Sequence, residues 1–256
     1  RSLETSAYNP VLAITDQGRV LGVKAREVPE MVRGSRGASV TEMFSLARGE
    51  KVVGLFADSD DPVVLVTRNG TAKRLDPDSL KSLRSGSSAI NLKGDDRLAS
   101  AFRCSEDTEV VIVASDGQAL RTASKGISLQ GPGAGGVAGM KLKPGSRVLA
   151  AGPVDFGTLV VLVSDEGAVK VTDAAEVPTK GRATGGVRTV RWRDFETTAT
   201  FAWVGRGQQL AAVARAAGDD KKLEPVPEPL SLDPTKRDSQ TVALDYRVAL
   251  VGEYRF

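Results

Sequence analysis

Short apolar runs alternate with polar turns along the whole chain, and this alternation repeats about every fifty residues. Each apolar run leads into a turn that closes on a glycine. The runs are Val11–Ile14, Val63–Val66, Val110–Val113, Leu159–Val163 and, more weakly, Leu210–Val213; the glycines are Gly18, Gly70, Gly117, Gly167 and Gly218. The steps between these glycines are 52, 47, 50 and 51 residues. A period of this length, built from short strand-like runs, predicts a ring or array of small sheets.

The second unit shows the strands expected within one repeat. Its first apolar run is rich in β-branched residues, and Asn69-Gly70 is a hairpin signal because this pair tolerates the positive φ angles of primed turns. A longer polar segment, Lys81 to Ser88, follows the hairpin. The four predicted strands cover 63–67, 71–75, 89–92 and 97–102. The pattern therefore predicts an all-β, propeller-like fold of about five four-stranded antiparallel blades.

The other units follow the same order of strands and turns. Their expected third strands are Val40–Leu46, Val137–Leu142, Val187–Trp192 and Val242–Leu244, and the fifth unit is degraded and proline-rich over 224–233. We expect a single domain over 1–256, with blades at 9–57, 61–104, 108–154, 157–205 and 208–256. Residues 1–8 precede the first unit as 97–102 precede the third, which predicts that they form the last strand of an earlier blade.

Composition narrows the chemistry. The chain has 256 residues, 41% of them hydrophobic and only 5% aromatic, so the core is expected to be aliphatic. It contains no histidine, which removes the usual general base and the commonest metal ligand, and its single cysteine, Cys104, excludes an internal disulfide. The sequence has no apolar run of about 18 residues, the length expected of a membrane span. We therefore expect neither a catalytic site nor a bound cofactor in this domain, and we expect a monomer in a reducing cytoplasm.

Basic residues recur at fixed distances from the hairpin glycines. Three or four residues after the glycine stand Lys73 and Arg74, Arg121, Lys170, and Lys221 with Lys222, whereas the first unit has Leu21 and Gly22 there. The long loops carry a second set: Arg33, Arg36, Lys81, Arg84, Lys125, Lys180, Arg182, Lys236 and Arg237. Such recurrence predicts two parallel basic tracks around the rim, suited to the backbone of a curving duplex. The alternative is that these are ordinary solvated charges.

Acidic residues and glycines recur as well. Asp58, Asp60, Asp61, Asp95, Asp96, Glu106 and Asp107 fall in the turns between blades and between third and fourth strands, where they mark a face turned away from a polyanion or serve as turn formers. The glycine clusters 131–139 and 181–186 lack the Gly-Lys-Ser/Thr of a phosphate-binding loop, so we expect them to allow close backbone packing.

Four stretches, in order along the chain, resemble a known family. They are Gly18–Val20 with Val28–Glu30 and Arg33–Gly37, then Thr67–Arg74, Gly133–Met140 and Gly181–Val187. These stretches are similar to the C-terminal β-pinwheel domain of the A subunit of bacterial type IIA topoisomerases, DNA gyrase and topoisomerase IV. The resemblance implies strands exchanged between neighbouring blades and duplex DNA bent around a basic rim. It also implies an A and B subunit heterotetramer near the nucleoid, with ATP and Mg bound elsewhere in that assembly.

The same resemblance bears on which enzyme the domain serves. Gyrase carries the heptapeptide Gln-Arg-Arg-Gly-Gly-Lys-Gly, and the nearest segments here, Met31–Gly37 and Thr179–Gly185, lack its glutamine and its paired central glycines. That absence does not decide between the two enzymes, whereas the degraded fifth unit, without a long acidic tail, favours a topoisomerase IV-like A subunit that guides DNA for strand passage, in decatenation and relaxation. The gyrase DNA-wrapping domain is the first alternative, and a propeller-like scaffold for protein partners is the second. Tyr8, Tyr246 and Tyr254 do not match the setting of the family's nucleophilic tyrosine.

Overall fold

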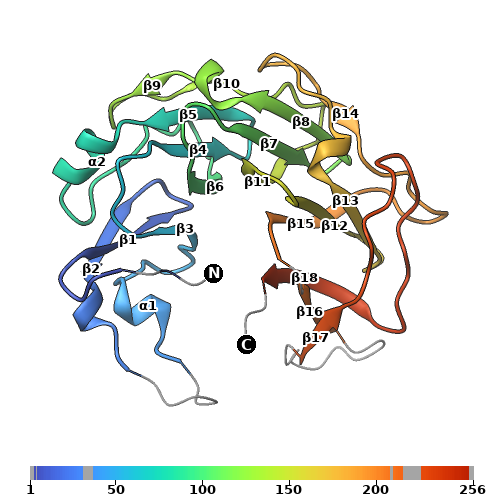
Figure 1. Cartoon of the computed structure of the whole chain (residues 1–256), viewed down its shortest axis with the longest axis horizontal. Helices are drawn as coiled ribbons and strands as arrows, with labels where there is room; N and C mark the ends of the chain where they lie inside the picture. Colours follow the sequence, from blue (N-terminus) through green and yellow to red (C-terminus); the bar gives the residue numbers. More distant parts are fainter. Residues whose placement is uncertain (1–2, 4, 31–36, 208–209, 216–225, 254–256) are drawn as a thin grey trace.

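Five small antiparallel sheets follow one another along an open arc, which Figure 1 shows from above. The computed structural model describes residues 3, 5–30, 37–207, 210–215 and 226–253, with the backbone alone at 210–215 and 226–228. Strands dominate these residues, and the prediction of an all-β pinwheel is confirmed.

Each blade has an antiparallel strand pair and a returning inner strand; in blades 1 to 4 the pair is the predicted hairpin, whereas the turn predicted at Gly218 lies outside the described residues. Blade 1 comprises β1 (Pro10–Thr15), β2 (Val20–Lys24) and β3 (Val52–Phe56); blade 2 comprises β4 (Val63–Thr67), β5 (Thr71–Leu75) and β6 (Leu98–Arg103). Blade 3 comprises β7 (Glu109–Ala114), β8 (Gln118–Ala123) and β11 (Val148–Val154); blade 4 comprises β12 (Leu159–Ser164), β13 (Val169–Asp173) and β15 (Ala199–Gly205). Blade 5 comprises β16 (Leu210–Arg215), β17 (Val226–Leu230) and β18 (Arg247–Glu253).

The outermost strand of a blade comes from the next repeat. β9 (Leu129–Gln130) and β10 (Val137–Ala138) of the third unit pair with β5, and β14 (Val187–Arg188) of the fourth unit pairs with β8. Isolated bridges Arg19–Ser88 and Val169–Val242 mark the same exchange in blades 1 and 4. The expectation that each unit forms its own four-stranded sheet is therefore wrong, whereas the strand exchange implied by the family resemblance is confirmed.

The hairpin glycines meet two requirements. Gly70 and Gly117 have φ angles of 85° and 79°, which L side chains rarely adopt. A Cβ at Gly70 would lie 2.4 Å from the Met140 carbonyl oxygen, and one at Gly117 would lie 2.4 Å from Val190 Cγ1. Met140 and Val190 follow the invading strands β10 and β14, so the recurring glycine both makes the turn and admits the strand of the next unit.

The hydrophobic core lies between successive blades. Four clusters join blade 1 to 2, 2 to 3, 3 to 4 and 4 to 5, with Ile14, Val64, Val111 and Val161 among their fully buried members. A further cluster lies within blade 1, around Leu21 and Phe44. No hydrophobic cluster of the described residues joins blade 5 back to blade 1, so the blades form an arc rather than a closed ring.

The first unit departs from the pattern. The strand expected over Val40–Leu46 is instead the short helix α1 (Val40–Met43), which pairs with no described strand. Phe44, at its end, packs into the core of blade 1. The strand expected near the N-terminus is absent from residues 3 and 5–8, where Leu3 contacts the same core and the Asn9 amide closes a turn onto Ser6.

Short helices fill the loops that follow the second strands. In the second unit this is α2 (Pro77–Ser82), with Pro77 in its first turn and the Asp76 carboxylate accepting the Ser79 amide at 2.8 Å. The others are the 3₁₀ turns η1 (Ala25–Glu27), η2 (Ser124–Gly126) and η3 (Ala174–Glu176). In the fifth unit, the proline-rich segment contributes β17, which lies at the edge of its sheet, where a missing N–H is tolerated.

Candidate nucleic-acid interface

The described members of the basic track that follows the hairpin glycines are buried or half-buried. Lys73 lies on β5 and has no exposed surface, and its ammonium group donates to the carbonyl oxygens of Gly131, Pro132 and Ala134 at 2.7, 3.2 and 2.9 Å. All three acceptors belong to the loop between β9 and β10, in the next repeat. The prediction that Lys73 is exposed on the rim is wrong, because its charge is occupied in holding that loop against blade 2.

Lys170 occupies the equivalent position on β13 and is 1% exposed. Its ammonium group donates to the Thr172 hydroxyl at 2.7 Å, to the Val171 carbonyl at 2.9 Å and to the hydroxyl and carbonyl of Thr235 at 2.8 and 3.2 Å. Burial lowers the pKa of Lys73 and that of Lys170 to about 8. The exposure predicted for Lys170 is therefore also wrong, and both lysines join consecutive repeats.

The two arginines of this track have protein partners as well. Arg74 is 5% exposed and donates to the Ile127 carbonyl at 2.8 Å and to the Glu106 carboxylate at 2.7 Å. Arg121 forms a two-point ion pair with Glu109, with 2.6 Å between Nε and Oε2. Burial acts to raise the pKa of Glu109, but hydrogen bonds from Thr179 and Arg121 outweigh it and hold that pKa below its usual value. Neither arginine forms the exposed track that the periodicity predicts.

The loop residues of the second track lie at the surface. Lys125, Lys180 and Arg182 are exposed and lie in or beside the segments that reach onto the preceding blade. The Arg182 guanidinium donates to the carbonyls of Gly126 and Ala138 at 2.9 and 3.2 Å, which fixes it over the exchanged strand. Arg237 repeats this contact one unit later, donating to the Arg188 carbonyl at 3.1 Å.

The remaining predicted residues divide into two groups. Lys81 and Arg84 are exposed at the end of α2 and just after it, and Lys81 forms an ion pair of 2.6 Å with Asp60. Arg33, Arg36, Lys221 and Lys222 lie outside the described residues.

Two further exposed cations, Lys141 and Arg191, were missed by counting from the hairpin glycines. Their amides donate to the carbonyls of Thr184 and Ser239 at 3.0 Å each, so the two residues occupy equivalent places after β10 and β14. Counting fifty residues between the exchanged strands, rather than from the hairpins, would have found them. Together with Lys180, Arg182 and Arg188 they form what we call the outer rim, because the exchanged strands are the outermost of their sheets.

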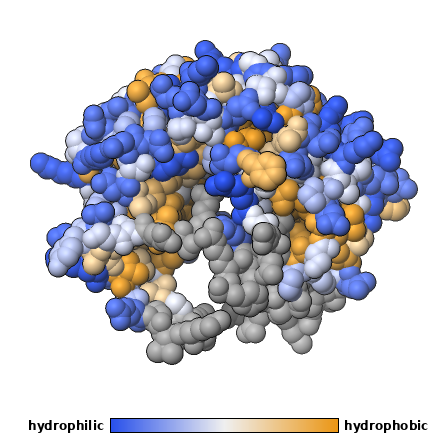
Figure 2. Space-filling view, in the orientation of Figure 1, coloured by the Kyte–Doolittle hydropathy of each residue, from blue (hydrophilic) through white to orange (hydrophobic). Residues whose placement is uncertain are grey.

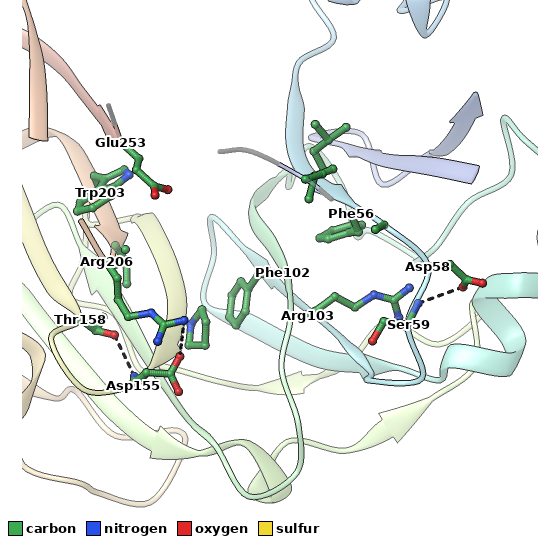
Figure 3. A pocket seen from close by; sticks show the side chains of 16 residues that line it. Phe56, Asp58, Ser59, Phe102, Arg103, Asp155, Thr158, Trp203, Arg206 and Glu253 are labelled. Carbon is green, nitrogen blue, oxygen red and sulfur yellow. Dashed lines mark hydrogen bonds and ion pairs between the residues drawn. The ribbon is translucent and has the colours of Figure 1, made fainter. Parts of the chain in front are cut away.

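Hydrophilic residues predominate on the perimeter of the arc in the view of Figure 2, as expected of this outer rim. The inner side is different. The ends of the innermost strands surround a cavity of about 370 Å³ on the axis. Figure 3 shows Phe56, Phe102 and Trp203 in its wall beside Arg103 and Arg206. Acidic side chains line the same cavity: Arg206 pairs with the Asp155 carboxylate at 3.4 Å, and Asp58 and Glu253 lie in its wall, while Arg103 donates to the backbone carbonyl of Asp61. The cavity therefore offers no surface of uniform charge.

The described residues include no group of three histidine, cysteine, aspartate or glutamate side chains placed to hold a metal ion. A helix long and apolar enough to cross a membrane is likewise not found in the part of the chain that the structure describes. Cys104 is buried and reduced.

Known proteins with the same repeats identify the family. The family described as the DNA gyrase C-terminal domain, beta-propeller, matches residues 9–57, 61–105, 108–155 and 158–196. The gyrase A subunits of Mycobacterium bovis and Aminobacterium colombiense are each 34% identical to this chain, over 152 and 149 residues that cover 57% of it. The match spans 18% of the length of these relatives.

Solved structures show the same fold. The C-terminal domain of a DNA topoisomerase IV superposes with a TM-score of 0.82 at 22% identity, over 98% of this chain and 80% of that one. The C-terminal domain of a DNA gyrase A superposes with a TM-score of 0.72 at 18% identity, over 96% and 83%. With four matched repeats and the exchanged strands in place, the chain belongs to the DNA gyrase C-terminal domain family of type IIA topoisomerase A subunits.

Proposed function

We propose that this chain is the DNA-binding and DNA-bending domain of a topoisomerase IV-like A subunit. The observation that carries the proposal is the outer rim, where exposed lysines and arginines recur on the outermost segments of successive blades. Lys141 and Arg191 stand at equivalent places on neighbouring blades, and Lys180, Arg182 and Arg188 lie between them along the chain.

The shape of the arc supports bending rather than straight binding. Successive blades turn about the axis in Figure 1, so a duplex that contacts several of them follows a curve. Lysine and arginine side chains on an outer edge neutralise phosphates without reading bases, and the released counterions make binding steeply dependent on salt. Curvature and backbone contact are what a DNA-bending domain requires.

Within a whole enzyme, this domain would present a DNA segment to a catalytic region that passes one duplex through another. The strand passage would be driven by ATP bound to a separate B subunit, in a bacterial A and B subunit heterotetramer in the cytoplasm. The domain itself would bind neither ATP nor Mg. These proposals rest on the family, because the match spans 18% of the length of the gyrase A relatives.

The choice of topoisomerase IV over gyrase rests on the degraded fifth unit and is consistent with the segments that come nearest to the gyrase heptapeptide. Thr179–Gly185 reads Thr-Lys-Gly-Arg-Ala-Thr-Gly, without a glutamine or paired central glycines. A topology assay tests the choice: the parent A subunit is incubated with relaxed circular DNA and a nicking-closing enzyme. A topoisomerase IV-like domain leaves little net writhe, whereas strong positive writhe would assign the domain to gyrase.

Duplex binding is tested with a labelled 40-base-pair duplex, whose fluorescence anisotropy is followed over a range of salt concentrations. The variant Lys141→Gln/Lys180→Gln/Arg191→Gln removes three outer-rim charges. The control variant Lys81→Gln/Arg206→Gln/Arg247→Gln removes three charges that are paired with Asp60, Asp155 and Glu166. We expect the first variant to lower affinity at least tenfold and to reduce the slope of log K against log salt by about 2–3, at roughly 0.9 per phosphate contact. If the wild type does not bind the duplex, or binds without salt dependence, the domain is a protein scaffold instead.

A further inference from the structure

The arc has two faces that differ in which turns they carry. The backbone amides of Arg68 and Ser115, in the hairpin turns, donate to the carbonyls of Arg97 and Arg147 at 2.8 Å. Hairpin turns therefore lie beside the turns that join each exchanged strand to its inner strand. We call the side bearing both kinds of turn the turn face. The opposite side, the linker face, carries the connections between blades, since the amide of Ser124, at the end of β8, donates to Thr108 before β7.

The turns leading into the inner strands place cations in register. Each of these turns has four residues, and the backbone amide of the fourth donates to the carbonyl of the first. The first residue is Ala47 in blade 1, and in the next three blades it is a cation: Lys93, Lys143 and Arg193. The residue after the turn is again a cation in blades 1 to 3, namely Lys51, Arg97 and Arg147. These three residues occupy equivalent positions, because the carbonyl of each accepts a backbone amide from the hairpin turn of its own blade. The donors are Asp16 to Lys51, Arg68 to Arg97 and Ser115 to Arg147.

Several of these cations are free to meet a ligand. Lys51, Lys93 and Arg147 are exposed, and no ion pair of theirs is found among the described residues. Lys143 and Arg193 are paired with Asp116 and Glu196 at 3.2 and 3.1 Å. The three free cations come from three successive blades, so they continue over as much of the arc as the outer rim does.

The carboxylates of the turn face are largely occupied within the protein. Glu50 and Glu196 are buried at 6% exposure each, and their oxygens accept the amides of Ala47 and Arg193 at 2.8 Å. Asp16 is 5% exposed and accepts the Lys51 amide at 3.0 Å. The negative charge of these three carboxylates is therefore used on turn amides, whereas Asp95 and Asp194 in the same turns remain exposed beside the cations.

The linker face carries exposed carboxylates beside exposed cations of its own, Lys81 and Lys125. The connection between blades 1 and 2 exposes Asp58, Asp60 and Asp61, and that between blades 2 and 3 exposes Glu106 and Asp107. The expectation that all recurring acidic residues mark one face is thus corrected: the turns at Asp95 and Asp96 lie on the other side, beside the hairpins, where the Asp96 carboxylate accepts the Asn69 amide at 3.2 Å.

We propose that a bound duplex does not sit centrally on the outer rim but is displaced toward the turn face, where Lys51, Lys93 and Arg147 contact its phosphates. This inference rests on the proposed function. A duplex is wide enough to touch the rim with one strand and the turn face with the other, where the three free cations meet its phosphates. The displacement places the DNA on one defined side of the arc. A duplex that follows several blades therefore leaves the plane of the blades toward that side.

The test compares three triple variants in the anisotropy assay described above. Lys51→Gln/Lys93→Gln/Arg147→Gln removes turn-face charges, and the outer-rim and paired-charge variants are its references. We expect the turn-face variant to lose at least tenfold in affinity and about 2–3 in salt slope, like the outer-rim variant. If it behaves like the paired-charge control while the outer-rim variant still loses affinity, the inference fails and the proposed function stands. If the wild type does not bind, both fail.

Cross-linking gives a second, directional readout. Cysteines are introduced at Pro144, exposed on the turn face, or at Asp107, exposed on the linker face; the native Cys104 is 3% exposed and serves as the unreactive background. Each variant is coupled to a photoreactive maleimide and irradiated with the duplex. We expect cross-links from Pro144→Cys at least fivefold above those from Asp107→Cys. Equal yields, or the reverse order, would overturn the inference.

Discussion

Blades 2 and 4 carry a lysine where blades 1 and 3 carry a leucine, three residues after the hairpin glycine. The four residues are Leu21, Lys73, Leu120 and Lys170, and their exposed fractions are 4%, 0%, 0% and 1%. The position is thus equally buried in all four blades, although its chemistry alternates. The difference lies in the groups that pack against the side chain.

Against each lysine, the next repeat supplies oxygen atoms. Three carbonyls of the loop at 131–134 surround the Lys73 ammonium, and Thr235 supplies two oxygens to Lys170. Against Leu120, the neighbourhood is the apolar cluster that contains Ile127. A buried cation is tolerated where its hydrogens are all accepted and is costly elsewhere. One strand position therefore serves two kinds of joint between blades.

The largest effect is expected when a lysine is placed in a blade that has leucine at this position. For Leu120→Lys we expect a loss of more than about 4 kcal/mol in the free energy of unfolding, because the apolar cluster offers the ammonium no acceptors. Urea unfolding followed by circular dichroism measures the loss. The matched control Leu120→Met conserves volume and should cost under about 1.5 kcal/mol. A lysine variant as stable as this control would contradict the comparison.

The reverse change removes the charge from the lysine-type blades. Lys73→Met and Lys170→Met should each cost about 2–3 kcal/mol, because several carbonyl and hydroxyl oxygens lose a charged donor. Hydrogen exchange locates the effect: in Lys73→Met the amides of 131–136 should exchange faster, while those of the equivalent loop at 181–186 stay unchanged. Uniform acceleration in both loops would mean that the lysine does not act through its own loop.

A smaller difference between the lysine and leucine positions is expected in how the free energy of unfolding depends on alkaline pH. Burial lowers the pKa of Lys73 and Lys170 from 10.5 to about 8. Between these values the unfolded chain keeps protons that the folded chain has released, so the free energy of unfolding contributed by each lysine rises with pH; below about 8 it is flat. We expect the wild type to gain stability relative to Lys73→Met as the pH rises from 8 to 10.

The control for this pH series is Leu120→Met, which removes no titrating group, so its stability difference from the wild type should not vary over the same range. The measurement is the urea midpoint at each pH. A difference between the wild type and Lys73→Met that is constant from pH 8 to pH 10 would show that the folded-state pKa of Lys73 is not lowered.

The smallest expected effect is on DNA. Because the Lys73 ammonium is enclosed by loop carbonyls, Lys73→Met should change the affinity for a duplex less than twofold and leave the salt slope unchanged. The outer-rim variant, which removes Lys141, Lys180 and Arg191, should show the large loss at the same temperature. A reduced salt slope in Lys73→Met would show that this lysine reaches a phosphate after all.

The sequence predicted well the parts of each repeat that depend on near neighbours. The hairpins at Gly18, Gly70, Gly117 and Gly167 lie where the Asn-Gly and Asp-containing turns place them, and the inner strands β3, β6, β11 and β15 follow within a few residues. The exchanged strands were predicted too long: Val137–Leu142 shrinks to β10, at Val137–Ala138. Their partners lie in the preceding repeat, beyond the reach of any local pattern.

The candidate interface was predicted in part. Periodicity found the loop cations Lys125, Lys180 and Arg182 at the surface, but it also selected Lys73 and Lys170, which are buried. A lysine in a strand has the same sequence signature whether it faces water or a ring of carbonyls. The periodicity counted from the hairpin glycines missed Lys141 and Arg191, because these residues are in register with the exchanged strands and not with the hairpins.

By itself, the sequence determined the repeat length, the turn at each glycine and the all-β class, because these follow from backbone preferences and apolar spacing within a few residues. The tertiary structure decided which repeat supplies the outermost strand, that the five blades form an open arc, and which recurring cations are left to bind a partner. Those outcomes depend on contacts between residues roughly fifty or more positions apart, such as Lys73 with Gly131. The sequence therefore determines the fifty-residue period, but contacts with the neighbouring repeat determine whether each recurring cation is buried or exposed.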